Sequence, residues 1–243
     1  MNEHLSVEEY IAMQPSLTRK RQLLRGIFGW LCFTFMWKVE TSGIENLPDS
    51  GPTMLIMNHI SSIDPFLALG AVKKRFVIPM TKIENLENPF LSPFIRAWGA
   101  YSIRRGEFDR KALLNSIELI KSGQLVLIAP EGTRAPTGLS QPKDGMTYVA
   151  TKANAIIVPM GVSAGAIEWK ERLKKLRRAD VHLNFGRPFR FKTEGRERIP
   201  RDELAQMTEE AMYQLALALP NPELRGIYSD MSKATTQYIE FVD

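Results

Sequence analysis

The sequence has few of the residues that build disulfide frameworks and metal sites. Cys32 is the only cysteine among 243 residues, so the chain forms no internal disulfide, which fits a reducing, cytosol-facing compartment. His59, Asp64 and Glu131 are the candidates for metal ligands, but the three histidines of the chain include no H-x-x-x-H pair and there is no cysteine pair. We therefore expect no metal and no cofactor beyond the substrates.

The chain also lacks a hydrophobic run long enough to cross a bilayer. The apolar residues 26–37 would rise roughly 18 Å as a helix, against a hydrocarbon core of roughly 30 Å. No small-residue cleavage site follows them, so a secretory signal fits poorly. Basic residues flank the run and it holds Trp30 and Trp37, which suits partial insertion into one leaflet. The alternative is a helix buried against the sheet.

The charge balance is basic, with a formal net charge of +5 and a pI near 9.3, which suits anionic partners. No nucleic-acid-binding module is recognisable, so we expect no nucleic acid partner. Residues 167–178 place Trp169, Leu173 and Leu176 on one face of a predicted helix whose other positions hold six cations. This pattern is typical of a helix at a membrane surface, and a solvated helix face is the competing interpretation.

Short apolar runs alternate with helical patterns along most of the chain. A strand followed by a turn is predicted at residues 39–47, and further strands at 54–57, 75–80, 101–103, 125–129, 156–160 and 179–185. Helices are predicted at 65–72, 90–98, 113–122, 146–153 and 202–219. This alternation predicts an α/β fold with a mostly parallel central sheet flanked by helices. We expect an N-terminal helical membrane-association segment at residues 1–38 and one α/β domain at 39–243.

One of these loops carries a histidine followed by an aspartate. Asn58 and His59 come directly after the apolar run 54–57, and Asp64-Pro65 predicts a helix start with Asp64 as the N-cap. In open α/β sheets, ligands bind at this carboxyl edge of the strands. An imidazole with a carboxylate five residues on can act as a general base with its orienting partner. The alternative is that Asp64 only caps the helix and His59 is only a loop histidine.

Three further blocks follow this one in order. They are Lys82 to Pro89 with Gly99 to Arg105, then Pro130-Glu131-Gly132-Thr133-Arg134 followed by Lys143-Asp144-Gly145, and finally Ile157-Val158-Pro159. Over residues 58–159 the chain resembles the glycerolipid acyltransferase family, which includes bacterial 1-acylglycerol-3-phosphate acyltransferase and whose first block is N-H-x-x-x-x-D. The ending from Pro220 to Tyr228 is also similar. The family usually carries Asp or Asn where this chain has Arg104, so the acceptor pocket differs there.

The resemblance implies acyl transfer from a thioester to an alcohol, which needs a base, a grip on the acceptor and donors for the developing oxyanion. His59 would take the hydroxyl proton and later give one to the leaving thiolate, with Asp64 orienting the ring. No covalent intermediate is required. The acceptor would be a lysophospholipid, 1-acylglycerol 3-phosphate above all, with glycerol 3-phosphate or another lysolipid as alternatives.

The third block supplies the candidate binding residues. Gly132 allows close backbone approach, and Arg134 offers a planar fork of donors matched to phosphate. Glu131 would bind a glycerol hydroxyl or pair with Arg134, and Thr133 completes the block. The resemblance implies that Arg105 and Arg134 contact the acceptor phosphate. Further substrate-binding candidates with less support are Arg104 and Lys143.

A hydrolase is the competing enzyme class. Residues 161–165 read G-x-S-x-G between a strand and a helix, and Ser163, Asp180 and His182 follow in triad order. Asp180 and His182 lie two residues apart in one predicted strand, however, whereas a triad takes its acid and base from separate loops.

The partners expected from the acyltransferase interpretation are a phospholipid membrane surface, a lysophospholipid acceptor, and acyl-CoA or acyl carrier protein as donor. We expect a monotopic or peripheral membrane association at the cytoplasmic face, while the oligomeric state is left open by the sequence.

Overall fold

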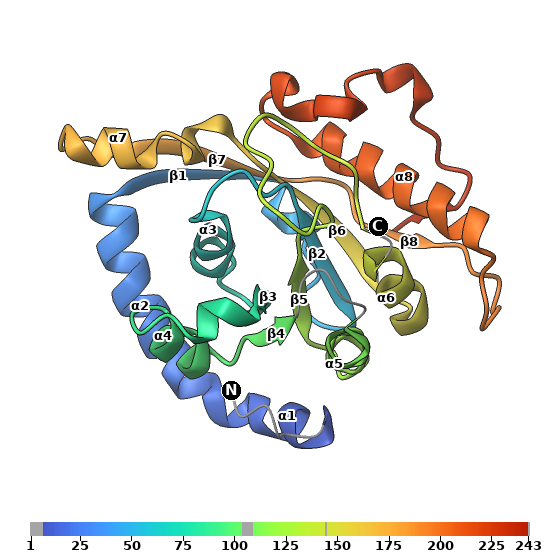
Figure 1. Ribbon diagram of the computed structural model, residues 1–243, viewed down its shortest axis with the longest axis horizontal. Coiled ribbons are helices and arrows are strands. Elements are labelled where there is room, and N and C mark those ends of the chain that lie inside the picture. Colours follow the sequence, from blue (N-terminus) through green and yellow to red (C-terminus); the bar gives the residue numbers. More distant parts are fainter. Residues whose placement is uncertain (1–6, 104–108, 144, 243) are drawn as a thin grey trace.

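The computed structural model describes residues 7–103, 109–143 and 145–242, and in it a twisted sheet separates two layers of helices (Figure 1). The strand order is β1-β7-β6-β2-β5-β3-β4, with β8 beside β6 and β9 beside β8. Among the described residues the strands are β1 (Trp37–Ser42), β2 (Thr53–Met57), β3 (Val77–Lys82), β4 (Tyr101–Ile103), β5 (Leu125–Ile128), β6 (Ile156–Val162), β7 (Ala179–Phe185), β8 (Phe189–Phe191) and β9 (Ile239–Phe241).

The five strands from β6 to β4 run parallel, which confirms the predicted mostly parallel sheet. β7 pairs with β6 in the antiparallel sense, and β1 runs parallel to β7. β7 and β1 therefore begin at the sheet edge where β2, β5 and β6 end. Since Val162 pairs with Leu183, residues 179–182 of β7 extend past the last residue of β6.

Helices cover both faces of the sheet. In Figure 1, α2, α3 and α4 form the layer on the left, and α5, α6 and α8 form the layer on the right. Among the described residues the α-helices are α1 (Val7–Met13), α2 (Thr18–Phe35), α3 (Asp64–Ala71), α4 (Ser92–Trp98), α5 (Arg110–Lys121), α6 (Gly145–Ala153), α7 (Trp169–Lys174) and α8 (Arg201–Ala218). The 3₁₀ segments are η1 (Gln14–Leu17), η2 (Ile44–Asn46), η3 (Ile83–Leu86), η4 (Ala164–Ala166), η5 (Pro222–Tyr228) and η6 (Met231–Lys233).

β2 lies in the centre of the sheet and carries the candidate catalytic loop. Every residue of β2 is buried, because β5 and β6 flank it and helices cover both faces. A continuous apolar run is the sequence pattern of such a strand. From this strand the chain continues into the loop that holds His59, at the carboxyl edge of the parallel strands.

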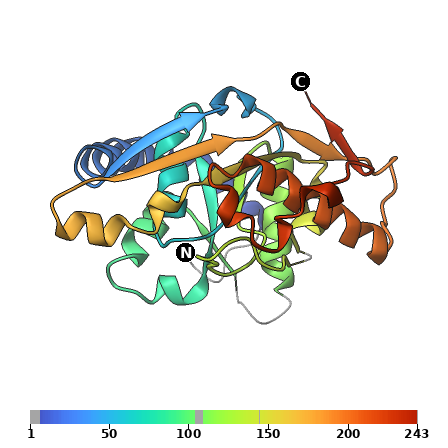
Figure 2. The same cartoon turned by 90° about the horizontal axis from the view of Figure 1, so that it is seen from above.

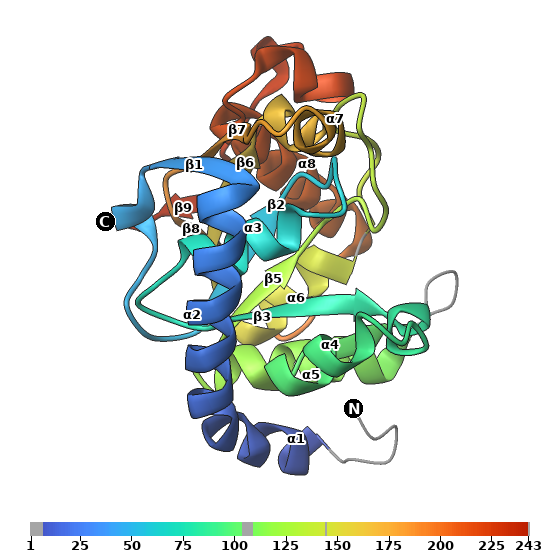
Figure 3. The same cartoon turned by 90° about the vertical axis from the view of Figure 1, so that its left-hand side faces the viewer.

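The N-terminal helices are fastened to the rest of the domain by buried polar groups. The Tyr10 hydroxyl donates to the Gly99 carbonyl, and Arg21 Nε donates to the Trp98 carbonyl at 2.6 Å. Burial lowers the pKa of Arg21 to about 10. Figure 3 shows α2 running along the side of the domain, where it packs on α3, α4 and β1. Within the described part of the chain, no helix combines the length and apolarity needed to cross a membrane.

Some predicted boundaries differ from the structure. The apolar run 26–37 does not form one helix, because α2 ends at Phe35 and Trp37 begins β1 with 2% of its surface exposed. Trp30 is 65% exposed, so one of the two tryptophans faces solvent and the other lies in the core. The strand and turn predicted at residues 39–47 correspond to β1 and the turn η2, with β1 starting two residues earlier, at Trp37. The proposed division at residue 38 stays a prediction.

The helix predicted at residues 167–178 is also shorter than expected. α7 covers Trp169–Lys174, and the following Leu176 has a positive φ of 53° that ends the helix. β8 and β9, which the sequence pattern did not indicate, extend the sheet beside β6 (Figure 2).

Candidate active site

His59 and Asp64 are joined by a hydrogen bond in the loop between β2 and α3. His59 Nδ1 lies 2.9 Å from Asp64 Oδ2, and the same oxygen accepts the backbone N–H groups of Ile60 and Ser61, each at 2.7 Å. Asp64 is fully buried, whereas the His59 side chain is 13% exposed. The carboxylate therefore fixes the loop and the ring together, and one edge of the ring remains open to solvent.

The geometry also indicates which nitrogen of His59 carries the proton. Burial raises the pKa of the Asp64 carboxyl, and the bonds from His59, Ser61 and Ile60 act in the opposite direction. Asp64 Oδ1 has no hydrogen-bond partner among the described residues, so a proton there would be a buried donor without an acceptor. The ionised carboxylate fits better, and it requires Nδ1–H as the donor. Nε2 is then left with its lone pair, as a general base needs.

In the structure, Asp64 does not cap the helix α3. The helix α3 starts at Asp64 itself, its N-cap position is Ile63, and no side chain caps it. The carboxylate points back into the preceding loop instead of toward the first turn of the helix. The prediction of an N-cap at Asp64 is therefore wrong by one residue, and the carboxylate serves the histidine loop.

Glu131 binds the other side of the histidine loop. Its Oε2 accepts the His59 N–H at 3.0 Å, and its Oε1 accepts the N–H and hydroxyl of Ser140 at 3.0 and 3.2 Å. The Ala135 N–H donates to the His59 carbonyl at 2.7 Å. The backbone of His59 is thus held on both sides by the segment after β5. Burial raises the pKa of Glu131, while these bonds lower it.

The remaining residues of this block form an exposed turn. Gly132 has a φ of 69°, and a Cβ there would lie 3.2 Å from Lys143 Cγ, so glycine suits this position. Thr133, Arg134 and Lys143 are exposed. Arg134 precedes the residue that binds the His59 carbonyl, so its side chain starts close to the catalytic loop. The ion pairs of the described residues do not include the Glu131–Arg134 pair considered above.

The two remaining basic candidates, Arg104 and Arg105, lie outside the described residues. β4 ends at Ile103, directly before them, and it runs parallel to β3. This strand therefore ends at the same edge of the sheet as the strand that leads to His59.

Asn58 has a structural task that the sequence did not indicate. Its side-chain amide donates to the Val162 carbonyl at 3.0 Å, and its side-chain oxygen accepts the Val162 N–H at 2.7 Å. These two bonds extend the contact between β2 and β6 beyond their last ladder pair, Met57 with Met160. Asn58 therefore sets where β2 ends and His59 begins.

The competing hydrolase triad is not assembled. The Ser163 hydroxyl accepts the backbone N–H of His182 at 2.8 Å, and the imidazole of His182 lies 2.9 Å from Ser42 Oγ. Asp180 lies on the same strand and is exposed. The His182 imidazole is therefore bonded to Ser42 and does not serve Ser163 as a base. The set His59, Asp64 and Glu131 also provides no metal site, because no group of three or more potential metal ligands occurs in the described ranges.

A segment far along the chain supports the active-site loop, and sequence reasoning did not assign it a role. The Leu139 N–H donates to the Leu224 carbonyl at 2.9 Å, and the Ile227 N–H donates to the Leu139 carbonyl at 3.2 Å. Gly226 has a φ of 53°, and a Cβ there would lie 2.2 Å from the Leu139 oxygen. This contact holds the residue next to Ser140, which binds Glu131. The glycine in the ending Pro220 to Tyr228 was the available signal.

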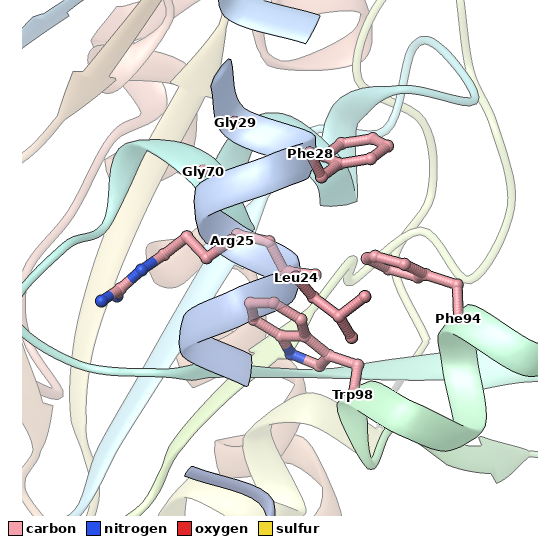
Figure 4. Close-up of a pocket in the computed structure, with 8 residues that line it drawn as sticks. Leu24, Arg25, Phe28, Gly29, Gly70, Phe94 and Trp98 are labelled. Atoms are coloured by element: carbon pink, nitrogen blue, oxygen red, sulfur yellow. The ribbon is translucent and has the colours of Figure 1, made fainter. Parts of the chain in front are cut away.

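An apolar pocket lies between α2, α3 and α4 (Figure 4). Phe28 from α2 faces Phe94 from α4, with ring centroids 5.4 Å apart. Phe66, in the first turn of α3, packs against both of these rings, at 5.3 and 5.5 Å. Since α3 starts at Asp64, this apolar layer begins two residues after the carboxylate that binds His59.

Comparison with known proteins places the chain in a family. A sequence model described as Acyltransferase matches residues 38–163, from β1 to the residue after β6. The chain belongs to the Acyltransferase family. The matched segment of this family member contains His59, Asp64, Glu131 and Arg134, and the family predicted from the sequence blocks is confirmed.

Curated relatives of this acyltransferase-family chain are named 1-acyl-sn-glycerol-3-phosphate acyltransferases. The 1-acyl-sn-glycerol-3-phosphate acyltransferase LPAT1, chloroplastic, of Arabidopsis thaliana is 31% identical over 128 residues, which cover 51% of this chain and 35% of the relative. The 1-acyl-sn-glycerol-3-phosphate acyltransferase of Borreliella burgdorferi is 28% identical over 126 residues, which cover 51% of this chain and 50% of the relative. The chain thus spans half or less of the length of these two relatives.

A solved structure has the same fold. The crystal structure of the 1-acyl-sn-glycerophosphate acyltransferase PlsC from Thermotoga maritima superposes with a TM-score of 0.60 at 22% identity. The match covers 91% of this chain and 81% of that chain. The predicted fold class is therefore confirmed.

Proposed function

We propose that this protein transfers a fatty acyl group from an acyl thioester, acyl-CoA or acyl carrier protein, to the free hydroxyl of a lysophospholipid. The proposed acceptor is 1-acylglycerol 3-phosphate, which gives phosphatidic acid. Glycerol 3-phosphate or another lysolipid is the alternative acceptor. The names of the curated relatives support this choice.

The observation that carries the proposal is the bond from His59 Nδ1 to the buried Asp64 carboxylate. It leaves Nε2 to take the proton of the acceptor hydroxyl. The alcohol oxygen then forms a bond to the thioester carbonyl carbon, the carbon–sulfur bond breaks, and the thiolate takes the proton back from the imidazolium. Asp64 stabilises the imidazolium between these two proton transfers, and no acyl-enzyme is needed.

The acceptor phosphate has candidate ligands beside the His59 loop. Arg134 is exposed on the turn whose backbone binds the His59 carbonyl, and Lys143, also exposed, lies beside that turn and donates its N–H to the Pro130 carbonyl. A guanidinium can donate two parallel hydrogen bonds to phosphate, and an ammonium adds a point charge. We assign Arg134 the main contact. Arg104 and Arg105, which follow β4, remain candidates for the same anion.

The acyl chain would lie in the apolar layer of Figure 4, which borders α3. The aromatic rings of Phe28, Phe66 and Phe94 would then limit how far the chain extends.

We also propose that the protein acts on a membrane surface, at the cytoplasmic face. One face of α2 exposes a stripe of large apolar side chains, here called the α2 stripe: Leu23, Ile27, Trp30, Leu31 and Phe35, each 48 to 65% exposed. A helix with such a face can lie in the interfacial region of one leaflet. This position would bring the enzyme to an acceptor that is itself a membrane lipid.

The test is thiol release from acyl-CoA or acyl carrier protein in the presence of 1-acylglycerol 3-phosphate. His59→Ala should abolish acceptor-dependent release without changing membrane binding. The matched control is His182→Ala, which changes a histidine of β7 that binds Ser42 of β1, and it should retain activity. Activity that survives His59→Ala would remove His59 from the mechanism, and loss of activity in Ser163→Ala together with its retention in His59→Ala would favour the hydrolase interpretation.

A further inference from the structure

The turn after α7 presents a leucine to solvent in an unusual backbone conformation. Leu176 is 94% exposed and has a φ of 53°. The Arg177 N–H donates to the Arg172 carbonyl and the Leu176 N–H to the Leu173 carbonyl, each at 2.9 Å, which is the Schellman pattern of a helix end. Glycine normally occupies the left-handed position of this motif, because a side chain there is strained. A bulky, solvent-exposed leucine at such a position is unfavourable for folding alone and points to another use.

Cations surround this leucine. Lys174, Lys175, Arg177 and Arg178 are all exposed. Lys174 forms an ion pair with Glu171 at 2.7 Å, whereas the ion pairs recorded for the described residues include none of the other three. The tip of the turn is therefore one apolar side chain inside a ring of positive charge.

The turn lies beside the end of the α2 stripe. The Ala179 N–H donates to the Met36 carbonyl at 2.9 Å, and Arg178 Nη1 lies 3.4 Å from the Thr34 carbonyl. Figures 1 and 2 both place α7 and the last turns of α2 at the same end of the molecule. β7 begins here at the carboxyl edge of the parallel strands, the edge that carries His59. The exposed leucine, the apolar helix face and the catalytic loop thus share one end of the sheet.

We propose that the turn 174–178 is a second membrane contact, in which Leu176 enters the interfacial region and Lys175, Arg177 and Arg178 bind the phosphates of an anionic leaflet. This inference rests on the membrane association proposed above. It adds a second membrane contact to the one made by the α2 stripe. Two separated contacts define the orientation of the domain, whereas one helix permits rotation about its axis. A membrane fits better than a protein partner, because the cations of the turn match the phosphates of an anionic leaflet and the apolar side chains of the neighbouring α2 stripe match its interfacial region.

The strained backbone supplies a variant that separates binding from folding. Leu176→Gly removes the side chain and relieves the left-handed strain, so its melting temperature should equal or exceed that of the wild type. We expect its partition onto vesicles of phosphatidylcholine mixed with phosphatidylglycerol to fall about tenfold, the loss for one buried leucine side chain. The control is Leu217→Ala, which removes an exposed leucine from α8, in the helix layer away from α2. It should bind as the wild type does.

The charge part of the contact is tested in the same vesicle assay. Lys175→Gln combined with Arg177→Gln should weaken binding about tenfold or more on anionic vesicles, and much less on pure phosphatidylcholine. Arg198→Gln with Arg201→Gln, at exposed positions near the start of α8, is the control for net charge. Both variants of the turn, Leu176→Gly and the Lys175/Arg177 variant, should keep wild-type thiol release when the acceptor is dispersed in detergent. This assay measures acyl transfer separately from vesicle binding.

Two results would overturn the proposal. One is wild-type vesicle binding by Leu176→Gly in an experiment where Trp30→Ser, on the α2 stripe, lowers it. The other is an equal loss of binding in the Lys175/Arg177 variant and in its Arg198/Arg201 control. That result would show that binding depends on the net charge of the protein and not on the position of the cations. Absence of vesicle binding by the wild type would overturn the membrane association as well, and activity in detergent would show whether acyl transfer survives it.

Discussion

Replacing Asp64 with asparagine tests how the carboxylate assists His59. All three recorded donors, His59 Nδ1 and the N–H groups of Ile60 and Ser61, converge on Oδ2. Two of these are backbone donors, so the amide oxygen of an asparagine should take the place of Oδ2. Its NH₂ group then falls where Oδ1 lies, which has no hydrogen-bond partner among the described residues. The ring should keep its orientation and its proton on Nδ1, and lose only the negative charge beside it.

The size of the effect follows from that difference. A hydrogen bond to a charged group contributes about 1.5–3 kcal/mol and a neutral one about 1 kcal/mol, so the imidazolium loses about 0.5–2 kcal/mol of stabilisation. This corresponds to a decrease in kcat of roughly two- to thirtyfold. A tautomer change costs far more, about 10⁴-fold in the Asp-to-Asn variant of a serine protease. Asp64→Asn should lower the melting temperature only slightly, because its NH₂ group is a buried donor without an acceptor among the described residues, and the removal of a charge whose burial is unfavourable offsets part of that loss.

The assay is the initial rate of thiol release at saturating donor and acceptor, with a thermal unfolding curve for each variant. Asp64→Ala is the comparison, since it leaves the buried N–H groups of Ile60 and Ser61 without an acceptor and releases the ring. It should lose both stability and more activity than Asp64→Asn. If Asp64→Asn is as inactive as His59→Ala while it remains folded at the assay temperature, the asparagine does not preserve the tautomer and the argument fails. Full activity would show that Asp64 only shapes the loop.

Three further predictions concern other parts of the site. Arg134→Ala should raise the KM for 1-acylglycerol 3-phosphate about tenfold or more with a smaller change in kcat, because one charge-assisted phosphate contact is lost; an unchanged KM would place the phosphate elsewhere. Gly226→Ala should lower kcat, since its Cβ would displace the Leu139 oxygen and with it Ser140 and Glu131. Gly195→Ala is its control, because Gly195 has a φ of 73° and nothing within 4 Å of a built Cβ, and equal effects of the two variants would reduce the result to backbone strain. Phe94→Ala should shift the donor preference toward longer acyl chains in a competition between acyl-CoA lengths, and an unchanged preference would place the acyl chain outside this pocket.

Local sequence was sufficient for the centre of the fold. The apolar run 54–57, the histidine after it and the Asp64-Pro65 helix start all lie within twelve residues, and each gives a pattern that depends only on its neighbours. The strand, the loop and the contact between His59 and Asp64 were therefore predictable. The detail that was missed, an N-cap at Asp64, depends on one bond direction, because the carboxylate can face either the helix or the loop.

Long-range contacts account for the rest. Glu131 is 72 residues from the backbone N–H that it accepts at His59, and no pattern near Glu131 distinguishes that contact from a pair with Arg134. Trp37 reads as the last residue of an apolar helix until β7 is available to pair with it. Leu176 reads as a helical position, and its left-handed conformation is visible only in the structure.

The pairing of β1 with β7 has a consequence for how the protein is made. β1 is the first strand among the described residues, yet Ser42 at its end meets His182, 140 residues later. At about 5–20 residues per second, translation needs on the order of ten seconds to cover that distance. During this interval the pairing edge of β1 has no partner strand. β1 therefore acquires its partner only after most of the sheet has been made, so this edge of the fold closes late.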